Sequence, residues 1–117
     1  MTQERYVALN GKYLADADRL LGEGDYPQAS EKYRGAAAQM VKAVAEARSW
    51  RHSSHRDLRN AISRLSREIG DTEYLDLFST AESLHANFYE DFLEPEDVRH
   101  YATRIRRLIE KLQGLLN

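Results

Sequence analysis

The stretch PQASEKYRGAAAQMVKAV, residues Pro27–Val44, decides the fold of this 117-residue chain. Its small and apolar side chains recur every three or four residues, which is the spacing of one helix face; they are Ala29, Tyr33, Ala36, Ala37, Met40, Val41 and Val44. Because alanine is small, this face lets neighbouring helices approach closely. Pro27 suits the first turn of such a helix, where a backbone N–H is not needed. The stretch therefore predicts a helix that packs against other helices.

Apolar residues repeat at helical spacing on both sides of this stretch, and no segment shows the sustained alternation of a half-buried strand. The sequence thus predicts an all-α fold, a single compact bundle of about five helices. Their apolar stripes cover roughly residues 6–21, 29–44, 58–69, 74–92 and 98–115.

Turn and capping residues punctuate these stripes. The Gly22–Asp25 segment is expected to separate the first two helices, and Arg51–His55 interrupts the pattern before the third. We expect Gly70 to cap the end of the third helix and Thr72 to cap the start of the fourth. Pro95 should open the fifth helix, because proline is tolerated in a first turn.

Length and composition limit the possible classes of protein. A chain of this size can bury roughly two-thirds of its unfolded surface around one core, so residues 1–117 are expected to form a single domain. The absence of cysteine excludes disulfides, thiolate zinc sites and thiol nucleophiles. No apolar run approaches the ~20 residues that span a bilayer, and residues 1–20 lack the pattern of a secretory signal. We therefore expect a cytoplasmic protein without membrane association.

The net charge of −2 hides a segregation of charge along the chain. Residues 48–67 hold six arginines against one aspartate, residues 71–97 hold nine acids and no Lys or Arg, and residues 98–117 hold five basic residues against one acid. Such blocks commonly pair across a bundle. Alternatively, the first block binds the phosphates of nucleic acid weakly; the candidate contacts are Arg51, Arg56, Arg59 and Arg64.

His85 is the histidine that lies on an apolar stripe, four residues after Ala81 and three before Phe88. We expect its imidazole to be at least partly buried. A hydrogen bond to a facing tyrosine or carboxylate would give it a structural role, whereas a ligand-binding role would involve Asn87 and Tyr89 nearby. Burial in the core would favour the structural role, and a cleft shared with an arginine from another helix would favour chemistry.

The last helix carries a narrow apolar seam at spacings of three and four residues: Val98, Tyr101, Ile105, Leu108, Leu112 and Leu115. The seam must pack on the rest of the bundle or on a second copy of the chain. Because twofold dimers are the commonest oligomers, we expect a homodimer. No metal site or cofactor is expected, since His52 and His55 lack further ligands at a suitable spacing.

Four segments in order resemble the HEPN superfamily, the higher eukaryote and prokaryote nucleotide-binding domains, and its small archaeal members in particular. They are YLADADRLLGEGDYPQASEKYRGAAAQMVKAVA (13–45), SHRDLRNAISRL (54–65), LHANFY (84–89) and EPEDVRHYATRIRRLIEKL (94–112). The resemblance spans about residues 6–113. It implies a five-helix bundle, commonly a homodimer, that acts beside a nucleotidyltransferase-type partner in a two-component module such as a toxin–antitoxin pair, or as a metal-independent ribonuclease.

The ribonucleases of this superfamily resemble one another in an arginine, a polar residue just after it, and a histidine four to six positions further on. A neutral histidine can take the ribose 2′-hydroxyl proton while arginine stabilises charge on the phosphate. Here no arginine lies between Arg67 and Arg99, so His85 lacks such a partner. Arg48 and His55 fit the spacing but lie across the junction of two helices, and the motif is degenerate.

The sequence therefore favours a non-catalytic binding or assembly subunit. Its expected role is either to bind nucleotide or RNA or to pair with a nucleotidyltransferase-type partner in a two-component module. A metal-independent endoribonuclease is the alternative, with His85, Arg48 and His55 as the candidate catalytic residues. A second alternative is a tetratricopeptide-like interaction hairpin, because the offsets of half a repeat are matched by Gly24, Tyr26, Ala29, Tyr33 and Ala36.

Overall fold

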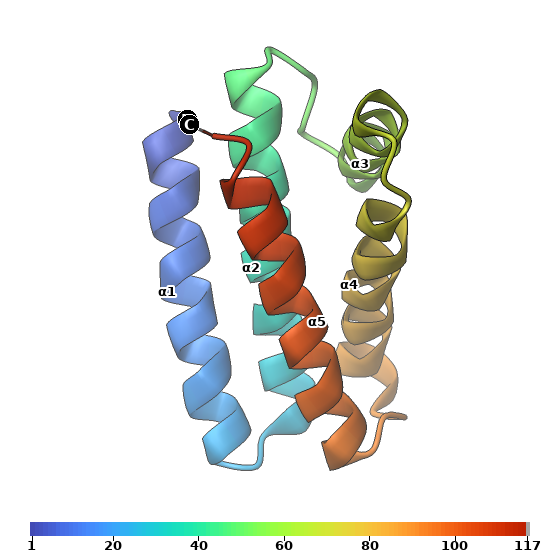
Figure 1. Cartoon of the computed structure of the whole chain (residues 1–117). Coiled ribbons are helices and arrows are strands. Elements are labelled where there is room, and N and C mark those ends of the chain that lie inside the picture. The colour runs from blue at the N-terminus through green and yellow to red at the C-terminus, as the bar shows by residue number, and fades with distance from the viewer. Residues whose placement is uncertain (117) are drawn as a thin grey trace.

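The computed structural model describes residues 1–116 and contains five α-helices, with no strand among these residues (Figure 1). The predicted all-α bundle is confirmed. The helices are α1 (Gln3–Gly22), α2 (Tyr26–Ala47), α3 (His55–Ile69), α4 (Glu73–Glu90) and α5 (Pro95–Gln113).

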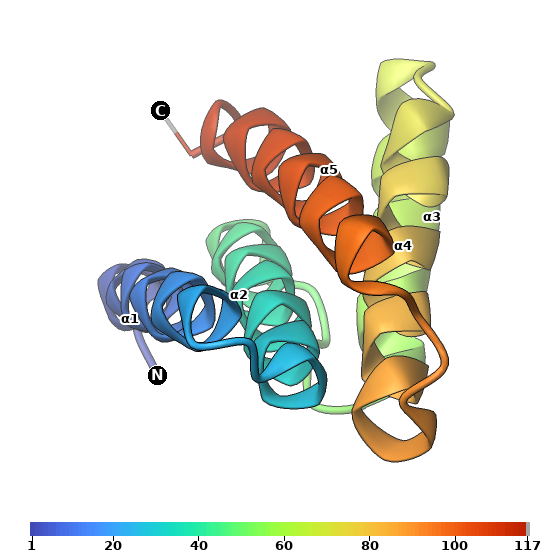
Figure 2. The same cartoon turned by 90° about the horizontal axis from the view of Figure 1, so that it is seen from below.

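Helix α2 lies at the centre of the bundle and contacts all four other helices. Figure 2 shows α1 on one side of α2 and the α3–α4 pair on the other, with α5 packed against both α2 and α4. The molecule measures 38 × 26 × 23 Å. One side of α2 therefore faces both α3 and α4, and the candidate site lies between these three helices.

The small-residue face of α2 forms the centre of the core, as its spacing predicts. All seven residues named for this face are at most 1% exposed. Gly35 adds a close approach on the side of α1, because a Cβ atom there would lie 3.3 Å from the Tyr13 ring. The missing side chain thus lets that ring rest against α2.

The helix ends follow the predicted punctuation with one exception. Gly70 caps α3 in the left-handed conformation (φ 76°), and Pro95 is the first residue of α5. Thr72 occupies the N-cap position of α4, but its side chain makes no capping hydrogen bond. The carboxylate of Asp71 accepts instead from the backbone N–H of Glu73, at 2.9 Å, and Thr72 itself already has helical backbone angles (φ −73°, ψ −9°).

Helix α4 ends earlier than its apolar stripe suggests. The stripe extends to Phe92, but the helix stops at Glu90 and Phe92 is 53% exposed. The cause is the buried side chain of Asn87, whose oxygen accepts from the backbone N–H groups of Phe92 and Leu93 at 2.8 and 2.7 Å. These bonds turn the chain out of the helix, so the prediction was wrong at this end.

The apolar seam of α5 is covered within the chain. Val98, Ile105, Leu108 and Leu112 are fully buried, and α5 packs against α2 and α4. Tyr101 and Leu115 are partly buried against the same core. The seam is therefore explained without a second copy of the chain.

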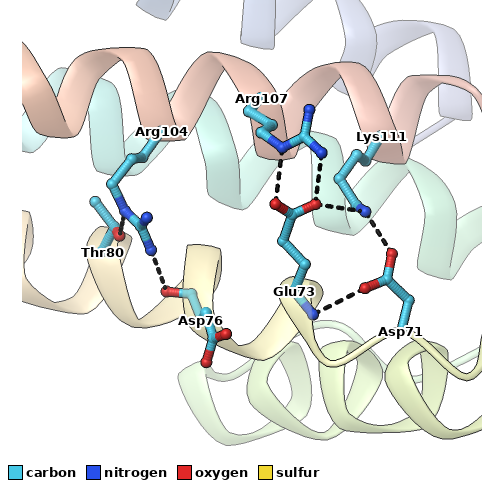
Figure 3. A network of polar contacts seen from close by, with 7 residues as sticks. All are labelled: Asp71, Glu73, Asp76, Thr80, Arg104, Arg107 and Lys111. Carbon is cyan, nitrogen blue, oxygen red and sulfur yellow. Dashed lines mark hydrogen bonds and ion pairs between the residues drawn. The ribbon is translucent and has the colours of Figure 1, made fainter.

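The acidic block finds its counterpart mainly in α5 (Figure 3). Glu73 accepts hydrogen bonds from Arg107 and Lys111 at 2.8–2.9 Å, and Lys111 also pairs with Asp71. The predicted pairing with the basic block is found at Glu82, which contacts Arg59. The opposite charges thus hold α4 against α5 more than against α3.

The hydrogen bonds from Arg107 and Lys111 lower the pKa of Glu73 from its ordinary value of 4.5 to about 2. A carboxyl group with a depressed folded-state pKa stabilises the fold fully above pH 4.5 and loses that contribution as the pH falls toward 2. In the wild type, the unfolding free energy should fall as the pH is lowered from 4.5 to 2. We expect this fall to be smaller in Glu73→Gln, as measured by urea unfolding at each pH. Glu110→Gln on α5 removes a carboxyl group outside these ion pairs and is the control, which should leave the pH dependence of stability unchanged. If wild type and Glu73→Gln lost stability equally as the pH falls, the role given to Glu73 would be contradicted.

Candidate functional site

A pocket of about 270 Å³ opens between α2, α3 and α4. Its apolar part is formed by Ala38, Leu58, Phe78 and Ala81, all of which are buried. The polar residues at its edge are Arg34, His55, Glu82 and His85, which are all at least partly exposed. The pocket therefore combines an apolar floor with ionisable groups from three helices.

His85 is held at this edge by a carboxylate from another helix. Its Nδ1 lies 2.9 Å from Oε2 of Glu31, and Oε1 of Glu31 accepts from Nε of Arg34 at 2.7 Å. Because an ionised carboxylate only accepts hydrogen bonds, Nδ1 carries the proton and Nε2 of a neutral ring is the acceptor. The side chain of His85 is 45% exposed, so the predicted partial burial and carboxylate partner are both found.

His55 has the same kind of support. Its Nε2 lies 3.0 Å from Oε2 of Glu82, while Oε1 of Glu82 accepts from Arg59 at 3.0 Å. The ring stacks on Phe78, with centroids 6.0 Å apart and planes inclined by 25°. Ser54 fixes the position of His55, because it caps α3 in a reciprocal capping box with Asp57. The nitrogen that remains free on His55 is Nδ1.

The pocket thus has two matched sets, each an arginine, a carboxylate and a histidine. Sequence reasoning considered both histidines but missed Glu31, Arg34 and Glu82. Glu31 and Arg34 look like an ordinary surface pair at i, i+3, and Glu31 lies 54 residues before its histidine partner. One feature of the sequence could have indicated Glu31 and Arg34: both border the small-residue face of α2, which packs against neighbouring helices.

The other residues predicted for ligand binding or catalysis lie in different surroundings. Tyr89 is 72% exposed, and its ring stands edge-on to the His85 ring at 5.3 Å. Asn87 is fully buried and donates to Ser30 at 3.0 Å, in addition to its bonds at the end of α4. Arg48 lies away from the pocket, where it pairs with Glu68. The structure therefore brings His85, His55 and Tyr89 together but not Arg48 or Asn87.

Part of the basic block lies around Trp50. Arg64 lies over the indole ring at 4.3 Å, and Arg51 lines a shallow hollow beside it. Arg59 is committed to Glu82, whereas Arg51 and Arg56 form no ion pair within residues 1–116. The predicted nucleic-acid contacts thus separate into paired and unpaired arginines.

Other classes of site are not found in the part of the chain that the structure describes. Residues 1–116 contain no group of three or more His, Asp or Glu side chains arranged to hold a metal ion. None of the five helices combines the length and apolar character needed to cross a membrane, judged over the same residues. Of the residues that resemble half a tetratricopeptide repeat, Ala29, Tyr33 and Ala36 are buried in the chain's own core.

Comparison with known proteins agrees with the fold. A crystal structure of a protein from Sulfolobus solfataricus superposes with a TM-score of 0.83 and 24% sequence identity, covering 93% of this chain and 97% of the other. At this identity the similarity shows the fold alone. No curated protein is similar in sequence. The model of the archaeal PaREP1/PaREP8 family matches residues 5–109, and the chain belongs to this family.

Proposed function

We propose that this chain is a helical binding protein whose pocket takes a nucleotide or one nucleotide unit of a single-stranded RNA. One observation carries the proposal: a single pocket combines an apolar floor with an arginine and two histidines, and each histidine is hydrogen-bonded to a carboxylate. Ligand sites commonly combine apolar walls with a few convergent polar groups. The resemblance to HEPN nucleotide-binding domains supports the same class of ligand.

The apolar floor suits the flat part of such a ligand. Leu58 and Phe78 line the floor from α3 and α4, and the His55 ring stacks on Phe78 as the exposed aromatic group. Nucleobases stack on aromatic rings regardless of sequence, because every base has a π-face. The volume of about 270 Å³ admits one base, not an extended strand.

The polar edge suits the phosphate. Arg34 uses Nε and Nη2 on Glu31, which leaves the donors of Nη1 for a ligand. A guanidinium group binds phosphate oxygens through several N–H donors held in a fixed plane. His85 adds Nε2, which accepts from a ribose hydroxyl when the ring is neutral and donates to phosphate when it is charged.

We expect Arg34→Gln to weaken nucleotide binding by at least about tenfold, because hydrogen bonds to a charged group contribute about 1.5–3 kcal/mol. The measurement is isothermal titration with the four nucleoside 5′-monophosphates. Arg19→Gln is the matched control, since Arg19 forms an exposed pair with Glu23 on α1. Equal affinity of the Arg34 variant and the control would contradict the proposal.

A second candidate function is metal-independent cleavage of RNA, and the paired histidines favour it. Nε2 of His85 would take the proton of the ribose 2′-hydroxyl, whose oxygen attacks phosphorus, and the charged ring of His55 would give a proton from Nδ1 to the departing 5′-oxygen. The products are a 2′,3′-cyclic phosphate and a 5′-hydroxyl. Arg34 would stabilise the charge that develops on the phosphate.

The two candidates give opposite results with RNA in the presence of a metal chelator. As a binding protein the chain should leave the RNA intact, because the Arg–His motif of the ribonucleases is degenerate here. Cleavage that resists the chelator and is lost in folded His85→Gln and His55→Gln variants would establish the second candidate. Gel analysis of a labelled oligonucleotide provides the measurement, with His100→Gln as the control.

Assembly belongs to the same proposal. The HEPN resemblance supports a homodimer or a nucleotidyltransferase-type partner, which would make the chain one half of a two-component module. Because the α5 seam is covered internally, such contacts would use exposed apolar residues such as Tyr89 and Phe92 at the end of α4.

A further inference from the structure

We propose a second nucleotide subsite that shares Arg34 with the histidine pocket. This inference rests on the proposed function. A hollow of about 280 Å³ lies between α1 and α2, and its lining includes Tyr13, Lys32 and Gln39. Arg34 lines both this hollow and the histidine pocket. The two sites are therefore neighbours that share Arg34.

Tyr13 supplies an aromatic surface in the hollow. Its ring rests on α2 at the position of Gly35, where a Cβ atom would lie only 3.3 Å away. The ring is thus held in place by the backbone of α2, and it is only partly buried. A positioned, accessible aromatic ring is the usual platform for stacking a base of single-stranded nucleic acid.

Lys32 supplies a positive charge beside that ring. Its Nζ lies 5.0 Å from the centroid of the Tyr13 ring, and it makes no ion pair within residues 1–116. A lysine held only by a cation–π contact can turn to a phosphate at little cost. The charge is therefore available to a ligand, in contrast to Arg59, which is committed to Glu82.

Gln39 supplies an acceptor that the protein leaves unused. Its Oε1 is buried and has no hydrogen-bond partner within the described residues. Buried polar atoms nearly always have a partner. A rotation of this side chain toward the hollow would let Oε1 accept from the amino group of a base. The aromatic ring, the cation and the amide together match the groups that recognise an unstacked nucleotide.

The shared arginine defines the ligand as a dinucleotide segment of RNA. One base occupies the histidine pocket, the next stacks on Tyr13, and the phosphate between them lies at Nη1 of Arg34. Lys32 then contacts the following phosphate. A mononucleotide fills only one of the two sites, so the segment should bind more tightly than its parts.

The test compares a 2′-O-methylated dinucleotide, which resists cleavage through the 2′-oxygen, with the 2′-O-methylated mononucleotide by isothermal titration, so that both compounds lack the same ribose hydroxyl. We expect the dinucleotide to bind at least about fivefold more tightly, because stacking of a base on an aromatic ring strengthens binding by roughly that factor or more. Lys32→Gln and Tyr13→Leu should each remove most of this advantage and leave mononucleotide binding unchanged. Lys12→Gln, an exposed lysine on α1, is the control.

The outcomes separate the subsite from the proposed function. Mononucleotide binding without a dinucleotide advantage would overturn the subsite and leave the histidine pocket as proposed. No binding of either compound would overturn both. Because Tyr13 also packs on α2, the Lys32 variant decides the case if Tyr13→Leu lowers the melting temperature.

Discussion

Replacing Leu108 by aspartate is expected to unfold the chain. Leu108 is fully buried on α5, where the helix packs against α2 and α4. The change loses about 1.5–3 kcal/mol of apolar burial and adds several kcal/mol for an unpaired charge in the core. The sum is comparable with the whole stability of a small domain, about 5–15 kcal/mol.

Circular dichroism of the purified variant measures this directly, with Thr103→Asp as the control on the exposed face of α5. The control should keep the helical spectrum and the Leu108 variant should lose most of it. A Leu108→Asp variant that stays folded and differs only in oligomeric state would contradict this account, because it would place the seam at an interface between copies.

Replacing Asn87 by alanine is expected to destabilise the fold by about 3 kcal/mol. The change removes the acceptor for two backbone N–H groups, those of Phe92 and Leu93, and the donor to Ser30. Each buried group left without a partner costs about 1–3 kcal/mol, and partial access to water at the end of α4 reduces the sum.

Urea unfolding followed by circular dichroism gives the free energy, and Asn60→Ala on the exposed face of α3 is the control. The control should change the stability by less than about 0.5 kcal/mol. If Asn87→Ala had full stability but weaker nucleotide binding, Asn87 would be a ligand contact, as its proximity to His85 in the sequence suggested.

The fold was predictable because the periodic signals are long and agree with the capping residues. The α2 face shows this best: its seven residues recur at helical spacing and are all buried. Phe92 shows the limit, since its spacing continues the α4 stripe while Asn87 ends the helix through hydrogen bonds that no periodicity encodes. Local side-chain capping overrides an apolar pattern at the end of a helix.

The candidate site was predictable only in part. His85 was identified because a histidine on an apolar stripe must find a partner. Its carboxylate partner, Glu31, lies 54 residues earlier in the sequence, and Arg34 lies on the same helix as Glu31. A single sequence does not show which helices face each other. The charge blocks do pair across the bundle, as predicted. For the same reason the sequence did not show that Asp71 and Glu73 pair with α5 and not with α3.

The central claim, that the pocket between α2, α3 and α4 binds a nucleotide, is tested most directly by nuclear magnetic resonance of the four imidazole side chains. On addition of a nucleoside monophosphate, the ring signals of His55 and His85 should shift together and saturably, while those of His52 and His100, which lie outside the pocket, should stay in place. Unchanged signals of His55 and His85 with all four nucleotides would contradict the claim, as would saturable shifts confined to His52 or His100.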